Sequence, residues 1–166
     1  MDTKPESMTS LKEIAAQLKQ HHERYGEPSG LSLAKIGDLL KETAAVMFPQ
    51  YAVAEQDELT LEERLEVLEN SFHKIVERLC RGKDVGCARA LVQGFLSDLP
   101  EIAKYGHRDA QALLEGDPAA HSLEEVILCY PGFFAVVAYR IAHRLYQRQV
   151  PMLPRMLTEY AHQKTG

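Results

Sequence analysis

The chain has 166 residues, of which 45% are hydrophobic and 26% are charged, and its formal net charge is −5. This size and composition predict one soluble globular domain, and the acidic balance argues against binding to nucleic acid through phosphate contacts. No apolar run reaches the roughly 18 to 20 residues of a membrane span, and the first residues do not resemble a signal peptide. We therefore expect a cytoplasmic protein without membrane attachment.

Apolar residues recur with helical spacing along nearly the whole chain, which predicts an all-α bundle of about seven or eight helices. A capping-box pattern at Ser10 starts the first helix, whose apolar residues share one face. Ser32 can cap a second helix, which Gly37 weakens and Pro49 ends. The apolar face of the first helix consists of Leu11, Ile14, Ala15 and Leu18.

The third helix begins at a second capping box, formed by Thr60 and Glu63, and should end near Arg81-Gly82. Its apolar residues repeat at intervals of four and three: Leu61, Leu65, Leu68, Phe72, Ile75 and Leu79. Such a seam suits an oligomer contact. For a helix of this length, packing inside its own bundle is the favoured interpretation.

Two helices are predicted between Asp84 and Glu115. Asp84 caps the first of them, and Asp98-Leu99-Pro100-Glu101 starts the second, because proline is favoured in the first turn of a helix. The buried candidates on these helices are Cys87, Ala88, Leu91, Phe95, Ile102, Tyr105, Ala112 and Leu113.

Gly116-Asp117-Pro118 ends the last of these helices, because glycine suits the left-handed cap and proline restrains the residue before it. Ser122 then caps a short helix in a further capping box, and Tyr130-Pro131-Gly132 interrupts it. The next helix runs to about Arg148 and the last from Pro154 to about Gln163. Their buried candidates are Phe133, Phe134, Val137, Ala138, Ile141, Leu145, Met156, Leu157 and Tyr160. Three arginines, Arg140, Arg144 and Arg148, line one edge of the predicted helix. Their charge could hold two helices or two subunits together, but a solvated face is the favoured interpretation.

Cysteines and histidines give no sign of a metal site. Cys80, Cys87 and Cys129 lack Cys-x-x-Cys spacing, and Cys80 and Cys129 stand in apolar runs where we expect burial. His143 and His162 each lie alone on an amphipathic helix, which favours a structural role over that of a general base.

Four motifs close the sequence: Gly116-Asp117-Pro118-Ala119-Ala120, Tyr130-Pro131-Gly132, Tyr139-Arg140-Ile141-Ala142-His143 and Glu159-Tyr160-Ala161-His162. Together they resemble the helical N-terminal region of bacterial serine O-acetyltransferases. In that family a left-handed parallel β-helix of hexapeptide repeats follows the equivalent of Thr165-Gly166. The resemblance implies that residues 1–166 are the N-terminal α-helical domain and that residues 150–166 are a connector helix. The chain departs from the family at Gln149, where many relatives have glycine.

The resemblance implies a parent enzyme that transfers acetyl from acetyl-CoA to L-serine, giving O-acetylserine for cysteine biosynthesis. The family's general base and coenzyme contacts lie in the β-helix, so this part alone should be inactive, with no catalytic residue, bound cofactor or metal. Asp117, with Pro118 beside it, corresponds to the family's serine site, where the carboxylate meets the substrate's amino group or hydroxyl. The residue types alone favour a turn role for Asp117.

The same resemblance implies a homo-oligomer joined through the N-terminal helices, since the family commonly forms a dimer of trimers. A complex with O-acetylserine sulfhydrylase would use a C-terminal tail outside residues 1–166. Two other functions remain open on the residues alone. One is a free-standing helical scaffold without enzymatic activity, and the other is a bundle that binds a small molecule in an apolar cavity.

Overall fold

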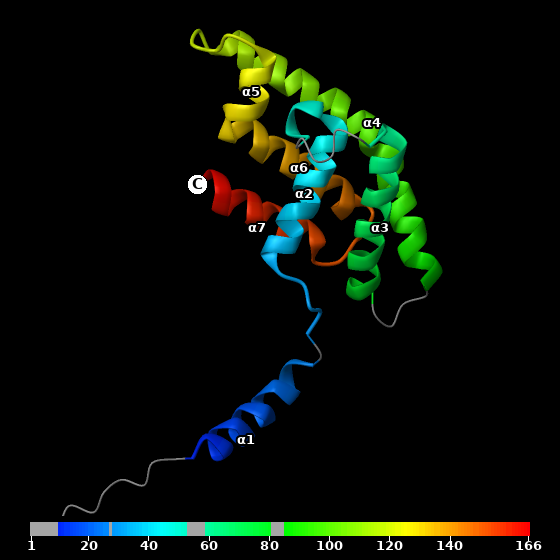
Figure 1. Cartoon of the computed structure of the whole chain (residues 1–166), viewed down its shortest axis with the longest axis vertical. Helices are drawn as coiled ribbons and strands as arrows, with labels where there is room; N and C mark the ends of the chain where they lie inside the picture. Colours follow the sequence, from blue (N-terminus) through cyan, green and yellow to red (C-terminus); the bar gives the residue numbers. More distant parts are fainter. Residues whose placement is uncertain (1–9, 27, 53–58, 81–84) are drawn as a thin grey trace, which may run out of the picture. The chain divides into compact units, whose positions relative to one another are not determined.

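The computed structural model describes residues 10–26, 28–52, 59–80 and 85–166, and every regular element in these ranges is a helix. The chain divides into two compact units, Met1–Gly30 and Leu31–Gly166. The first contains α1 (Leu11–His22) and the 3-10 helix η1 (Glu23–Tyr25). The second contains α2 (Leu33–Met47), η2 (Pro49–Tyr51), α3 (Leu61–Leu79), α4 (Val85–Gly116), α5 (Leu123–Cys129), α6 (Pro131–Gln147) and α7 (Leu153–Thr165) (Figure 1). The predicted all-α class is confirmed.

In the first unit, α1 starts at the predicted capping box. Glu13 N donates to Ser10 Oγ at 3.3 Å, and Ser10 N donates to Glu13 Oε2 at 2.9 Å. None of the residues of α1 is buried. Leu11, Ile14 and Leu18 share one face by their helical spacing and are 84%, 40% and 51% exposed. The helix therefore presents an apolar face to solvent.

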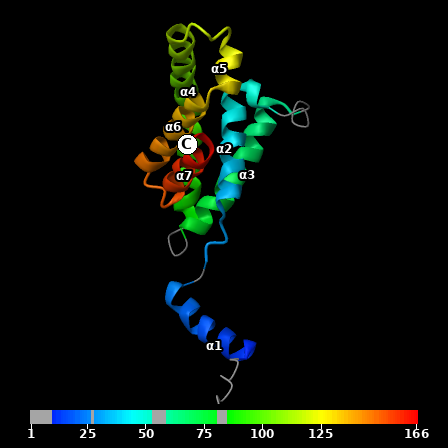
Figure 2. The same ribbon diagram turned by 90° about the vertical axis from the view of Figure 1, so that its left-hand side faces the viewer.

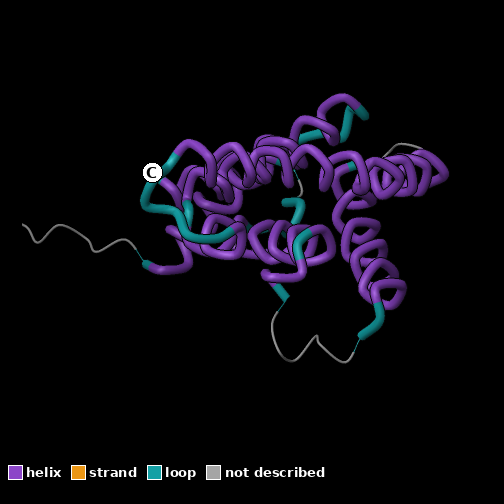
Figure 3. The backbone as a smooth tube through the Cα atoms, turned by 90° about the horizontal axis from the view of Figure 1, so that it is seen from above, coloured by secondary structure: helices purple, strands orange, loops and turns teal. Residues whose placement is uncertain are grey.

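In the second unit, five helices contact one another in a closed ring. The contacts run from α2 to α3, α3 to α4, α4 to α6, α6 to α7, and from α7 back to α2. α4 extends past the ring to the loop before α5, and short loops join most of the helices (Figures 1, 2 and 3). Large buried side chains from all five helices fill the interior: Ile36, Leu40, Phe72, Phe95, Ile141 and Leu157.

Ion pairs join α4 to α6 and to the C-cap residue of α6 along one side of this ring. They are Arg140 with Asp109, Arg144 with Glu101, and Arg148 with Asp98. The residue numbers of the acidic partners on α4 decrease as the residue numbers of the arginines increase, so the two helices run antiparallel here. The interpretation of these arginines as a solvated face is wrong, because each is only about one-third exposed and bonds a carboxylate of the neighbouring helix.

α4 is one helix of 32 residues with Pro100 inside it, so the prediction of two separate helices is wrong. Pro100 itself is exposed, whereas Leu99 and Ile102 on either side of it are buried in the core. Their packing holds the helix together although proline removes one backbone hydrogen bond. The predicted cap, Asp84, lies outside the described residues.

α3 packs inside its own bundle, but through a narrower stripe than the predicted seam. Its buried residues are Leu68, Phe72 and Val76, at steps of four, while Leu61 at the start of the helix is 55% exposed. Leu65, Ile75 and Leu79 are only partly buried. The expected end of this helix at Arg81-Gly82 lies outside the described residues.

Four other burial predictions are wrong: Cys87, Tyr105, Ala112 and Cys129 are exposed. Cys80 is buried, as expected. Tyr105 is 38% exposed and lies at the edge of the contact with α6, where the Arg140 guanidinium is 5.3 Å from its ring centroid.

No single helix in the described ranges has both the length and the apolar composition of a membrane span. α5 and α6 reach that combination only as a pair, and the pair is bent by 76°. Their apolar residues, including Val126, Phe133 and Val137, are buried in the core of the second unit.

Candidate functional site

Asp117 stands directly after α4, where the backbone turns towards α5. Asp117 N donates to Leu113 O at 3.1 Å, which continues the hydrogen bonding of the helix, and Ala120 N donates to Asp117 O at 3.0 Å. The side chain closes an Asx turn, because Ala119 N donates to Asp117 Oδ1 at 2.9 Å. Pro118 lies exposed within this turn. The structural role that the residue types favour is therefore real.

The other carboxylate oxygen has a partner that the sequence did not indicate. The Tyr130 hydroxyl donates to Asp117 Oδ2 at 2.6 Å. This bond, followed by the one from Ala119 N, lowers the pKa of the Asp117 carboxyl below its usual value of 3.8. The same bond raises the pKa of the Tyr130 hydroxyl to about 12. At neutral pH the pair therefore consists of an ionised carboxylate and a protonated hydroxyl.

Two helices, α5 and α6, hold Tyr130 in place. Tyr130 N donates to Val126 O at 3.2 Å at the end of α5, and Phe133 N donates to Tyr130 O at 3.1 Å at the start of α6. Tyr130 is the N-cap residue of α6, and proline occupies the first turn, as that position favours. The backbone on both sides of the tyrosine is thus bonded into a helix.

α5 itself is anchored at its start. Glu125 N donates to Ser122 Oγ at 3.1 Å, so Ser122 caps the helix as predicted. The Glu125 carboxylate accepts from His121 N at 2.8 Å instead of from the N-cap amide, so the predicted capping box is only half formed. Both His121 and Ser122, the last two residues of the loop between α4 and α5, are therefore hydrogen-bonded to Glu125 in the first turn of α5.

The arrangement can bind a cation or a hydroxyl. Asp117 is partly exposed, and an ionised carboxylate has about four lone-pair positions, of which the bonds from Ala119 and Tyr130 use two. An ammonium group that reached the loop could therefore bond the same carboxylate without displacing either partner.

The two histidines considered as general bases lie elsewhere. His143 is exposed on α6 and stacks on Tyr139 with ring centroids 5.7 Å apart. His162 is exposed near the end of α7. No hydrogen bond between the described residues joins either histidine to Asp117.

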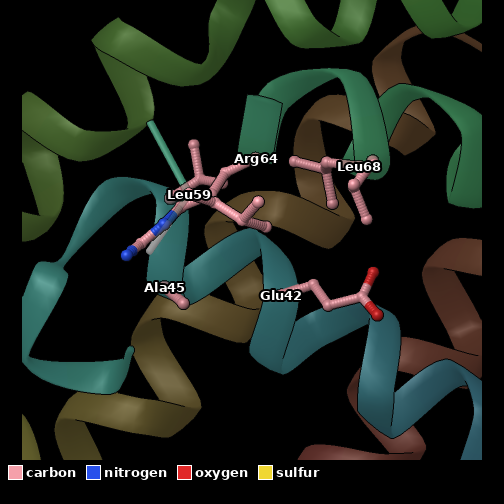
Figure 4. Close-up of a pocket in the computed structure, with 7 residues that line it drawn as sticks. Glu42, Ala45, Leu59, Arg64 and Leu68 are labelled. Atoms are coloured by element: carbon pink, nitrogen blue, oxygen red, sulfur yellow. The ribbon is translucent and has the colours of Figure 1, made fainter. Parts of the chain in front are cut away.

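A small pocket lies between α2 and α3 and does not include Asp117 (Figure 4). Its volume is about 30 Å³. It is lined by Glu42, Ala45, Val46, Leu59, Arg64, Val67 and Leu68. This is room for one or two water molecules, so this pocket is too small for an organic ligand.

Comparison with known proteins identifies the region that contains this site. The family model for the N-terminal region of serine acetyltransferase matches residues 72–138. The plasmid serine acetyltransferase of Synechococcus elongatus is 46% identical over 79 residues, which are 48% of this chain and 25% of that protein. The serine acetyltransferase of Mycobacterium tuberculosis is 47% identical over 58 residues, which are 35% of this chain and 25% of that protein.

Two solved structures share the fold. Serine acetyltransferase 1 of Entamoeba histolytica, in complex with L-cysteine, has a TM-score of 0.65 and 32% identity, covering 76% of this chain and 46% of that one. Isoform 3 from the same organism, in complex with cysteine, has a TM-score of 0.65 and 25% identity, covering 95% of this chain and 58% of that one. The chain thus spans about a quarter of these curated relatives and about half of the solved chains. Residues 72–138 of this chain are thus similar to the helical N-terminal region of the serine acetyltransferase family.

Proposed function

We propose that this chain is the N-terminal helical domain of a serine O-acetyltransferase, which transfers acetyl from acetyl-CoA to L-serine and gives O-acetylserine for cysteine biosynthesis. The observation that carries the proposal is the position of Asp117. It lies inside the family match, at a fixed turn, as an ionised and partly exposed carboxylate. In a scaffold without enzymatic activity the same residue would serve only the turn.

Asp117 and Pro118 form one side of the serine site in this proposal. The carboxylate accepts a hydrogen bond from the substrate's ammonium group, and such a charge-assisted bond both orients the amino acid and discriminates against simple alcohols. The rigid turn supports this role, because a carboxylate that is already fixed loses little entropy when the substrate binds.

The reacting groups belong to the β-helix domain of the family. The described residues contain no strand, so no part of a β-helix is among them. In this proposal the general base and the acetyl-CoA site belong to that β-helix, and the chain by itself binds no cofactor and does not transfer acetyl. In the enzyme the N-terminal helices join subunits, giving a dimer of trimers, and any contact with O-acetylserine sulfhydrylase uses the C-terminal tail.

The test replaces Asp117 in the enzyme that carries both domains. Asp117→Ala should raise the KM for serine by about tenfold to a hundredfold, the range for loss of one hydrogen bond to a charged group, with little change in the KM for acetyl-CoA. Steady-state kinetics with each substrate varied in turn measures both constants. The chain alone should produce no O-acetylserine in the same assay.

Asp117→Asn is the matched variant, because asparagine can close the same turn but carries no charge. It should also raise the KM for serine. If the asparagine variant matches the wild type while the alanine variant impairs both substrates equally, Asp117 acts only as a turn residue and the proposed serine contact is wrong.

A further inference from the structure

We propose that Tyr130 is a positioning residue of the serine site, which orients the Asp117 carboxylate for the substrate. This inference rests on the proposed function, since it assigns a second residue to the same site. Its basis is the direct bond from the Tyr130 hydroxyl to Asp117 Oδ2 at 2.6 Å, across thirteen residues of sequence.

The bond from Tyr130 restricts a rotation of the Asp117 carboxylate that the Asx turn alone permits. Ala119 N holds only Oδ1, at 2.9 Å, so the carboxylate plane could still swing about that contact. A second donor on Oδ2 fixes the plane as well. Since catalysis depends on the placement of the bound substrate, a carboxylate held at two points presents its remaining lone pairs in one direction.

Tyr130 is itself a rigid support. Its N–H bonds the end of α5 and its carbonyl accepts from the first turn of α6, at 3.2 Å and 3.1 Å. The hydroxyl therefore reaches the loop after α4 from a backbone that two helices hold. Glu125 and Cys129 are the other titratable groups near the tyrosine, and a negative charge on either also favours its protonated form. The hydroxyl thus remains a donor throughout the neutral range.

The structure provides a matched control in Tyr51. Its hydroxyl donates to Ile127 O, so it also bonds into α5, but it does not touch Asp117. Removing either hydroxyl deletes one oxygen atom and one hydrogen bond from the same part of the fold. Only the Tyr130 hydroxyl should influence the carboxylate.

The first measurement uses the chain itself. In Tyr130→Phe the pKa of the Asp117 carboxyl, followed by carbon NMR of the side chain, should rise towards its ordinary value, because the donor that lowers it is gone. Tyr51→Phe should leave that pKa unchanged. An unchanged pKa in Tyr130→Phe would overturn the proposal.

The second measurement uses the two-domain enzyme. Tyr130→Phe should raise the KM for serine by about threefold to tenfold, which is less than for Asp117→Ala because the carboxylate itself remains, and leave the KM for acetyl-CoA unchanged. At acidic pH, serine binding should fail at a higher pH than in the wild type, because Asp117 takes up its proton more readily. Tyr51→Phe should show neither effect.

The outcomes separate the two proposals. If Asp117→Asn raises the KM for serine and Tyr130→Phe does not, the serine contact stands and the role of Tyr130 is refuted. If neither Asp117→Asn nor Asp117→Ala affects the KM for serine, both proposals fall. A rise in the serine KM for Tyr51→Phe equal to that for Tyr130→Phe would show a general loss of local structure and would also refute the positioning role.

Discussion

Gln149 occupies a backbone conformation that favours glycine. Its φ is +59°, and the bonds from Gln149 N to Tyr146 O at 2.8 Å and from Val150 N to Leu145 O at 3.0 Å form the pair that defines a Schellman motif at the end of α6. Glycine usually stands at this position because it has no Cβ to clash with the carbonyl oxygen. The departure from glycine noted in the sequence therefore strains the backbone without changing the type of helix end.

Replacing this residue should relieve the strain. We expect Gln149→Gly to raise the free energy of unfolding by about 0.5 to 1 kcal/mol, since the gain at positive φ exceeds the entropy that glycine adds to the unfolded chain. Urea denaturation measures the change. Gln149→Ala keeps a Cβ at the same φ and should leave stability nearly unchanged, and an equal gain in both variants would contradict the explanation by strain.

In the candidate site, one residue could be predicted from the sequence and the other could not. The turn at Asp117 follows from its neighbours, because glycine and proline act on the adjacent backbone. The partner Tyr130 depends on how α5 folds back against the end of α4, and no short spacing encodes that. Its own motif, Tyr130-Pro131-Gly132, predicted only the interruption between two helices.

At the scale of elements, helix starts follow from local bonds, whereas helix continuity depends on packing. The capping boxes at Ser10 and Thr60 form as predicted because each closes within four residues. The Pro100 break does not occur, since Leu99 and Ile102 are anchored in the core that distant residues build. The residues around a proline do not reveal whether packing in the core will compensate for the N–H that the proline lacks.

The presence of glycine at position 37 in α2 is explained by close packing, which helix propensity does not reveal. A Cβ built there would lie 2.2 Å from ring atoms of Tyr160 on α7. Tyr160 is only 7% exposed and so has little room to move. The glycine that weakens α2 locally is what allows α2 and α7 to approach and close the ring.

Gly37→Ala should therefore destabilise the second unit. Overpacking of this kind costs about 1 to 3 kcal/mol, which exceeds the gain of about 1 kcal/mol that alanine normally brings to a helix. Gly132→Ala is the control, because a Cβ at Gly132 in α6 meets no atom within 4 Å. It should leave stability unchanged or raise it. A stabilised Gly37→Ala variant in thermal or urea unfolding would show that the two helices are not in close contact there.

At the scale of the molecule, apolar residues with helical spacing occur both in the core and on the exposed face of α1. The buried core cluster draws its residues from positions 36 to 161 and includes none of α1. The three apolar residues of α1 nevertheless keep the periodicity of a helix that buries one side. Sequence periodicity alone could not distinguish a face that packs in the bundle from one that remains exposed.

Under the proposed function, this exposed face joins subunits. We expect the wild-type chain to form a dimer or small oligomer at high micromolar concentration, and the combined change Leu11→Ser, Ile14→Ser and Leu18→Ser to lower its mass in light scattering. The free energy of unfolding of the second unit should stay the same, because no residue of α1 lies in its core. The control, Gln17→Ser with Gln20→Ser, alters exposed polar residues of the same helix and should keep the assembly. A strictly monomeric wild-type chain would remove α1 from the subunit contact, whereas loss of assembly in the control as well would point to the helix itself and not to its apolar face.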